Sequence, residues 1–85
     1  MPEISRFFGI VASIQYRDHE PAHFHATYGD YEISVGIQDG AVDGWFPKRA
    51  LRLVQEWRRL HSDALLENWQ LARERRRVKP IAPLE

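Results

Sequence analysis

The chain has 85 residues, of which 44% are hydrophobic and 28% are charged, and it contains no cysteine. This composition indicates one globular domain with a small core, and it excludes disulfides and thiolate metal sites. No apolar run approaches the ~20 residues that span a bilayer, and the first ten residues lack the features of a signal peptide. We therefore expect a cytoplasmic protein with no membrane partner.

The net charge is zero, but it is divided between the two halves of the chain. Residues 1–46 carry two basic and seven acidic side chains, a net charge of −5, whereas residues 47–85 carry ten basic and five acidic ones, a net charge of +5. This division indicates either a basic surface for an anionic partner or pairing between the halves. A basic, solvated helix face is the simpler explanation.

Alternation of apolar and polar residues predicts strands over residues 9–17, 23–28 and 31–37, with a short fourth strand within 41–46. Gly29 and Asp30 form a two-residue hairpin turn. That turn places Ala26 opposite Ile33, with the apolar residues of both strands on one face. Matching apolar faces between the first two strands places Tyr16 opposite Phe24.

The second half is expected to be helical from Pro47, with apolar residues at helical spacing. Ser62 and Asp63 are candidate N-caps of a second helix, although one long bent helix is the alternative. We therefore predict a single α+β domain over residues 1–75. In it an antiparallel sheet of three to four strands is followed by two helices packed on one face. Residues 76–85 are read as a basic, proline-containing tail.

The segment "DHEPAHFHA" at residues 18–26 concentrates three of the four histidines. His23 and His25 are two apart in a strand, so they share the face opposite Phe24. His19 belongs to the preceding turn, and Gly36 leaves a gap beside His23. The predicted polar cluster on this face consists of Gln15, Arg17, His23, His25, Glu32 and Ser34.

Three interpretations fit this cluster: two kinds of chemistry, and a sheet face with no chemical role. Metal-independent RNA cleavage would use His25 as the base and His23 as the acid. Glu32 would orient His25, and Arg17 would hold the phosphate. A metal site would use the two imidazoles with His19, or with a carboxylate such as Asp18 or Glu32, as third ligand. The third alternative is a solvated sheet face with no chemistry, and no cofactor is expected.

A basic run near the C-terminus is a candidate nucleic-acid-binding surface. It consists of Arg73, Arg75, Arg76, Arg77 and Lys79. A solubilising chain end or a helix C-terminus with favourable charge accounts for the same residues equally well. His61 is read as a structural residue at a helix end.

Five segments together resemble the bacterial family known as domain of unknown function 4160. They are "PEISRFFGI" at 2–10, "DHEPAHFHA" at 18–26, "YGDYE" at 28–32, "PKRAL" at 47–51 and "LLENW" at 65–69. The resemblance runs from Pro2 to about Arg73. The family pattern often has a second proline where this chain has Ala22, which leaves the histidines in place.

The resemblance implies a compact cytoplasmic bacterial protein and brings no established activity. Members are often encoded beside another small uncharacterised family, and the pair is sometimes proposed as a toxin–antitoxin module. We therefore expect a small cognate protein as partner, and RNA as the substrate if the domain is a toxin. A non-catalytic module that binds protein or nucleic acid is the alternative, and the sequence is compatible with oligomerisation.

Overall fold

The computed structural model describes residues 2–16 and 18–85, and it is an antiparallel sheet followed by two helices. The sheet order is β1-β2-β3-β4-β5. The strands are β1 (Glu3–Phe7), β2 (Ile10–Ser13), β3 (His23–Tyr28), β4 (Tyr31–Gly36) and β5 (Val42–Gly44), and the helices are α1 (Lys48–Leu60) and α2 (Ser62–Arg73). The predicted α+β class is confirmed, with five strands in place of three to four. Arg17 lies outside the described residues.

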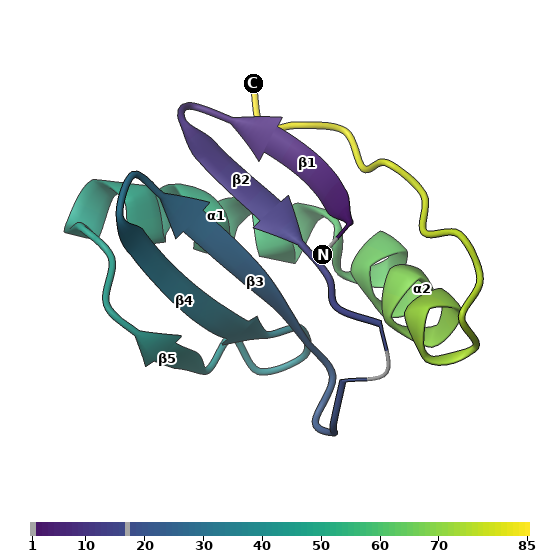
Figure 1. The fold of residues 1–85 in the computed structure, drawn as a ribbon. Coiled ribbons are helices and arrows are strands. Elements are labelled where there is room, and N and C mark those ends of the chain that lie inside the picture. The colour runs from purple at the N-terminus through teal and green to yellow at the C-terminus, as the bar shows by residue number, and fades with distance from the viewer. Residues whose placement is uncertain (1, 17) are drawn as a thin grey trace.

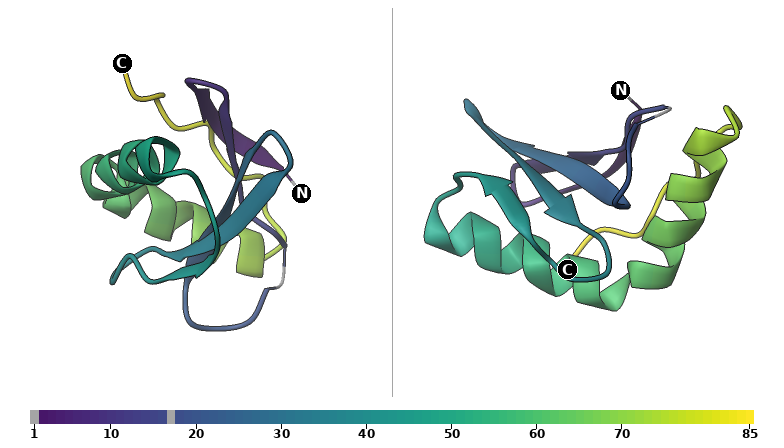
Figure 2. Two further views of the ribbon diagram at one scale, coloured as in Figure 1. Left: turned by 90° about the vertical axis from the view of Figure 1, so that its left-hand side faces the viewer. Right: turned by 90° about the horizontal axis from the view of Figure 1, so that it is seen from below.

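Figure 1 shows α1 behind the sheet and α2 beside it. Figure 2 shows α1 running across one face of the sheet, while α2 turns away beside its end. The stripe Ala50, Val54 and Trp57 on α1 is buried against the apolar face of the strands, as its spacing predicted. The helix breaks at His61, whose amide donates to the Trp57 and Arg58 carbonyls, so the alternative of one long bent helix is wrong. Neither helix within residues 2–16 and 18–85 has the length and apolarity that crossing a bilayer requires.

The first strand of the sheet, β1, was not predicted. Two features hide it. Ile4 and Ser5 are both buried because a bulge interrupts the ladder with β2, so the strand does not alternate. The turn that follows is Phe8-Gly9, with φ of 49° and 82°, whereas the usual signal for such a turn is Asn-Gly.

The β3–β4 hairpin has the predicted register, with Ala26 opposite Ile33 and His25 opposite Ser34. The β2–β3 register differs from the prediction by two residues. Ser13 lies opposite His25, and β2 ends there, before Gln15. A shift of two keeps every side chain on its own face, so alternation cannot distinguish the two registers.

The C-terminal segment 76–85 has no helix or strand, yet it packs along the body of the domain. Figure 1 shows it returning from α2 to the edge strand β1. The Ile81 amide donates to the Ile4 carbonyl at 2.7 Å, and Ile81 and Leu84 are buried in the core. The segment therefore covers the outer edge of β1 and contributes to the core, which its basic and proline-rich sequence did not indicate.

Asn68 anchors this segment to α2. Its side chain is 1% exposed and exchanges two hydrogen bonds of 2.8 Å with the Lys79 backbone, one as donor and one as acceptor. We expect Asn68→Ala to lower the free energy of unfolding by roughly 2–3 kcal/mol, because both Lys79 groups lose their partner. Urea unfolding measures this loss. Gln70→Ala on the exposed face of α2 is the control and should cost less than about 0.5 kcal/mol.

Candidate metal centre

Strand β3 presents His23 and His25 on the face opposite Phe24, as alternation predicted. Phe24 is fully buried, whereas the two imidazoles lie beneath the loop that joins β2 to β3. The His23 and His25 side chains are only 12% and 15% exposed. The pair is thus largely covered by neighbouring residues and does not lie on a solvated sheet face.

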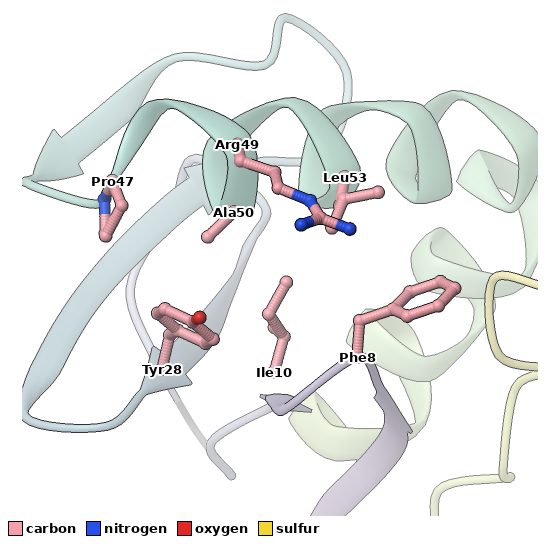
Figure 3. A pocket seen from close by; sticks show the side chains of 7 residues that line it. All are labelled: Phe8, Ile10, Tyr28, Pro47, Arg49, Ala50 and Leu53. Carbon is pink, nitrogen blue, oxygen red and sulfur yellow. The ribbon is translucent and has the colours of Figure 1, made fainter.

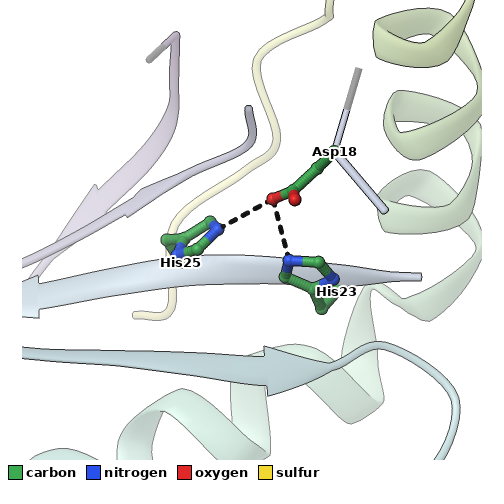
Figure 4. Close-up of side chains that lie close together, drawn as sticks. All are labelled: Asp18, His23 and His25. Atoms are coloured by element: carbon green, nitrogen blue, oxygen red, sulfur yellow. Dashed lines mark hydrogen bonds and ion pairs between the residues drawn. The ribbon is translucent and has the colours of Figure 1, made fainter. Parts of the chain in front are cut away.

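Asp18, in that covering loop, joins the two imidazoles (Figure 4). Its Oδ2 atom lies 2.9 Å from His23 Nε2 and 3.2 Å from His25 Nε2. The backbone amide of His19 donates to the other oxygen, Oδ1, at 2.9 Å. One carboxylate oxygen therefore faces two imidazole nitrogens, and the rest of the carboxylate is held in place by the loop backbone.

The His23 ring has a defined orientation. Its Nδ1 lies 2.8 Å from the Pro21 carbonyl oxygen, which can only accept a hydrogen bond, so Nδ1 carries a proton. A neutral ring then points the lone pair of Nε2 at the Asp18 carboxylate. Two acceptors at this distance need either a second proton on the ring or a cation between them. An Nδ1–H bonded to a backbone carbonyl is also how metal-ligating histidines are usually oriented.

The ionised carboxylate of Asp18 is favoured by its surroundings. Burial alone would raise the pKa of Asp18, but hydrogen bonds from the His19 amide and His25, with the charge and hydrogen bond of His23, hold it below its ordinary value. A lowered pKa in the folded state contributes stability above the ordinary pKa of aspartate. That contribution is lost as the pH falls through the lowered value.

Asp18, His23 and His25 form a group that could hold a small cation. One atom each from Asp18, His23 and His25 lie within 4.8 Å of one another. A tetrahedral zinc ion with bonds of about 2.0–2.1 Å holds its ligand atoms about 3.3 Å apart. The two distances to Asp18 Oδ2, 2.9 Å and 3.2 Å, approach that value.

The other predicted members of the site lie around this centre. Glu32 is exposed and lies opposite Thr27. Among the described residues no hydrogen bond joins Glu32 to His25, and the carboxylate that contacts His25 is that of Asp18. Glu32 instead lines a shallow depression with His25, Ser34 and Asp43. His19 is 85% exposed, and its ring packs 5.5 Å from that of His23 without joining the ligand cluster.

The space that Gly36 leaves beside His23 is partly filled. The Asp39 carboxylate occupies it, so a Cβ added at Gly36 would collide with Asp39 Oδ1. On its other side the His23 ring packs 5.1 Å from Trp69 of α2. The described side chains closest to the two imidazoles are therefore acidic and aromatic, which favours a cation over a phosphate.

The sequence profile of the family described as Domain of unknown function (DUF4160) matches residues 9–70, more than half of the chain. The chain belongs to the DUF4160 family. This membership confirms the resemblance that the histidine segment and the hairpin motif suggested. No curated protein and no solved structure matches this DUF4160 chain.

The basic run of the DUF4160 domain is largely paired with its own acids. Arg73 forms an ion pair with Glu20 in the loop that carries Asp18. Arg76 pairs with Glu74 at 3.5 Å, and Lys79 pairs with Glu67 at 2.8 Å. Only Arg75 and Arg77 have no ion pair among the described residues. The run therefore offers less free positive charge than its sequence indicated.

Proposed function

We propose that this domain binds a divalent transition-metal ion, with Zn²⁺ as the first candidate, through Asp18, His23 and His25. The observation that carries the proposal is the single Asp18 oxygen facing two Nε2 atoms, one of them on a ring whose proton is held at Nδ1 by Pro21. Two imidazoles and one carboxylate suit zinc and other borderline ions better than Mg²⁺ or Ca²⁺.

Three protein ligands leave a fourth position of a tetrahedral ion for water or substrate, as in catalytic rather than structural zinc sites. The domain also has a core of its own, built around Phe24 and Trp57, so folding does not need the ion. We therefore propose a site in which an ion can activate water or polarise a bound group.

The test is a titration of tag-free, chelator-treated protein with Co²⁺, whose visible absorption reports tetrahedral nitrogen and oxygen coordination. We expect one ion per chain, displaced by Zn²⁺. His23→Ala, His25→Ala and Asp18→Asn should each weaken binding by at least about 100-fold, because each removes a ligand. His19→Ala should bind like the wild type. Equal binding by all four variants would contradict the proposal.

A second candidate, a metal-independent ribonuclease, is favoured by one observation. His25 Nε2 contacts Asp18, while its Nδ1 has no hydrogen bond among the described residues. His25 would be the base, His23 the acid, and Asp18 would take the orienting role assigned to Glu32. Such an enzyme would act in the cytoplasm as the toxin of a two-component module, restrained by a small protein encoded nearby.

Cleavage of total RNA in excess chelator separates the two candidates. The ribonuclease hypothesis predicts cleavage under these conditions and slowed growth on expression, both abolished by His25→Ala. Growth of the strain that expresses wild-type protein should recover when the neighbouring small protein is produced with it. If RNA stays intact with chelator and the growth of wild-type and His25→Ala strains is the same, this candidate is excluded.

A further inference from the structure

A second concave site lies at the other end of β3. A cavity of about 220 Å³ opens between the β1–β2 turn, the end of β3 and the first turns of α1 (Figure 3). Its walls are mostly apolar and include Phe8, Ile10, Tyr28, Ala50 and Leu53, with Arg49 at the rim. Tyr28 at this cavity lies three residues along β3 from His25 of the metal centre and five from His23, which corresponds to a rise of about 10 Å and about 17 Å.

Phe8 has a backbone conformation that is energetically unfavourable for an aromatic residue. It is the first residue of the β1–β2 turn with φ of 49°, in the left-handed region that favours glycine or asparagine, and it is 55% exposed. A strained and exposed aromatic gains little for folding. Such outliers cluster at binding sites, where the contact that they make with a ligand offsets the strain.

Arg49 lines the cavity, and two further basic residues lie near it in the sequence of α1. Lys48, Arg49 and Arg52 are exposed on α1, and none has an ion pair within the described part of the chain. The first turn of α1 holds no acidic residue, and its N-terminus has no side-chain cap. Free positive charge therefore gathers at the start of α1, where it adds to the positive end of the helix dipole.

We propose that this cavity is the docking site for an acidic segment of a partner protein, which inserts one large apolar side chain. The segment's carboxylates would meet Arg49, Lys48 and the uncapped helix end, while its anchor would pack against Phe8 and Leu53. A nucleic-acid base suits the cavity less well. Among the described side chains that line the cavity, its polar edges would find only the Tyr28 hydroxyl and Arg49 as partners, which leaves most of those edges without a side-chain hydrogen bond.

Fluorescence anisotropy with short labelled peptides tests the proposal. Each probe carries one Trp, Phe or Leu between pairs of Glu residues, and the comparison probes carry Lys in place of Glu, or Ala in place of the anchor. Only the acidic, anchored probes should bind. Arg49→Glu should weaken binding by at least about tenfold, because it reverses the charge at the rim. Arg59→Glu is the matched control, about 15 Å along the same helix, and should bind like the wild type.

Phe8→Asn separates a binding role from a structural one. Asparagine is favoured at this turn position, so the melting temperature should rise, while the affinity for the acidic, anchored probe falls by at least about tenfold. The proposal is overturned if no acidic probe binds, or if Arg49→Glu and Phe8→Asn bind as the wild type does. Preferential binding of a single-stranded oligouridine that displaces the peptide would also overturn it, since the occupant would then be RNA.

Discussion

Zinc at one hundred times its dissociation constant is expected to raise the melting temperature of the wild-type protein by roughly 10–20 °C. An ion that binds only the folded state at this excess stabilises it by about 2.7 kcal/mol, and each kcal/mol shifts a domain of this size by about 4–8 °C. Differential scanning calorimetry of tag-free protein, with and without zinc, measures the shift.

The variants assign this effect to the three ligands. His25→Ala and Asp18→Asn should show no zinc-dependent shift, because two remaining ligands hold the ion too weakly to be occupied at the same concentration. His19→Ala removes a neighbouring, 85% exposed imidazole and should keep the full shift. A shift of equal size in His25→Ala would mean that zinc binds elsewhere on the chain.

Trp57→Ala is expected to lower the free energy of unfolding by about 3–5 kcal/mol, which is a large part of the ~5–15 kcal/mol that stabilises a typical domain. Trp57 is fully buried, and its ring centroid lies 5.2 Å from that of Phe7 and 5.5 Å from that of Phe24. Its Nε1 also donates to the Ala82 carbonyl at 2.9 Å, which ties the C-terminal segment to α1. Urea unfolding followed by circular dichroism measures the loss.

Two further substitutions test the role of Trp57: one separates its ring from its hydrogen bond, and the other is a control at an exposed tryptophan. Trp57→Phe keeps an aromatic ring and loses the bond to Ala82, so it should cost clearly less than Trp57→Ala. Trp45→Ala removes a tryptophan that is 63% exposed and should change the stability by little more than about 0.5 kcal/mol. Equal losses for Trp57→Ala and Trp45→Ala would contradict the packing described for the core.

The edge strand β1 and the C-terminal segment are the two parts of the fold that the sequence did not predict. The bulge at Glu3 and Ser5 hid β1, and Phe8 at a turn position that normally takes asparagine concealed the hairpin. The segment 76–85 has no periodicity at all, yet it is held by Asn68, Trp57 and the edge of β1. The hydrogen bonds that hold this segment join residues far apart in the sequence, which no local pattern of apolar and polar residues relates.

The sequence by itself determined the α+β class, the β3–β4 register and the face that carries His23 and His25. These follow from alternation and from a two-residue turn, which act between near neighbours in the chain. Only the tertiary structure decided what faces the two imidazoles. The loop from β2 folds Asp18 over them, and the β2–β3 register and the pairing of Arg73 with Glu20 likewise depend on packing between separate elements. A loop conformation has no period in the sequence, so the sequence left Asp18, Glu32 and His19 as alternatives for the third ligand, and only the folded chain selected Asp18.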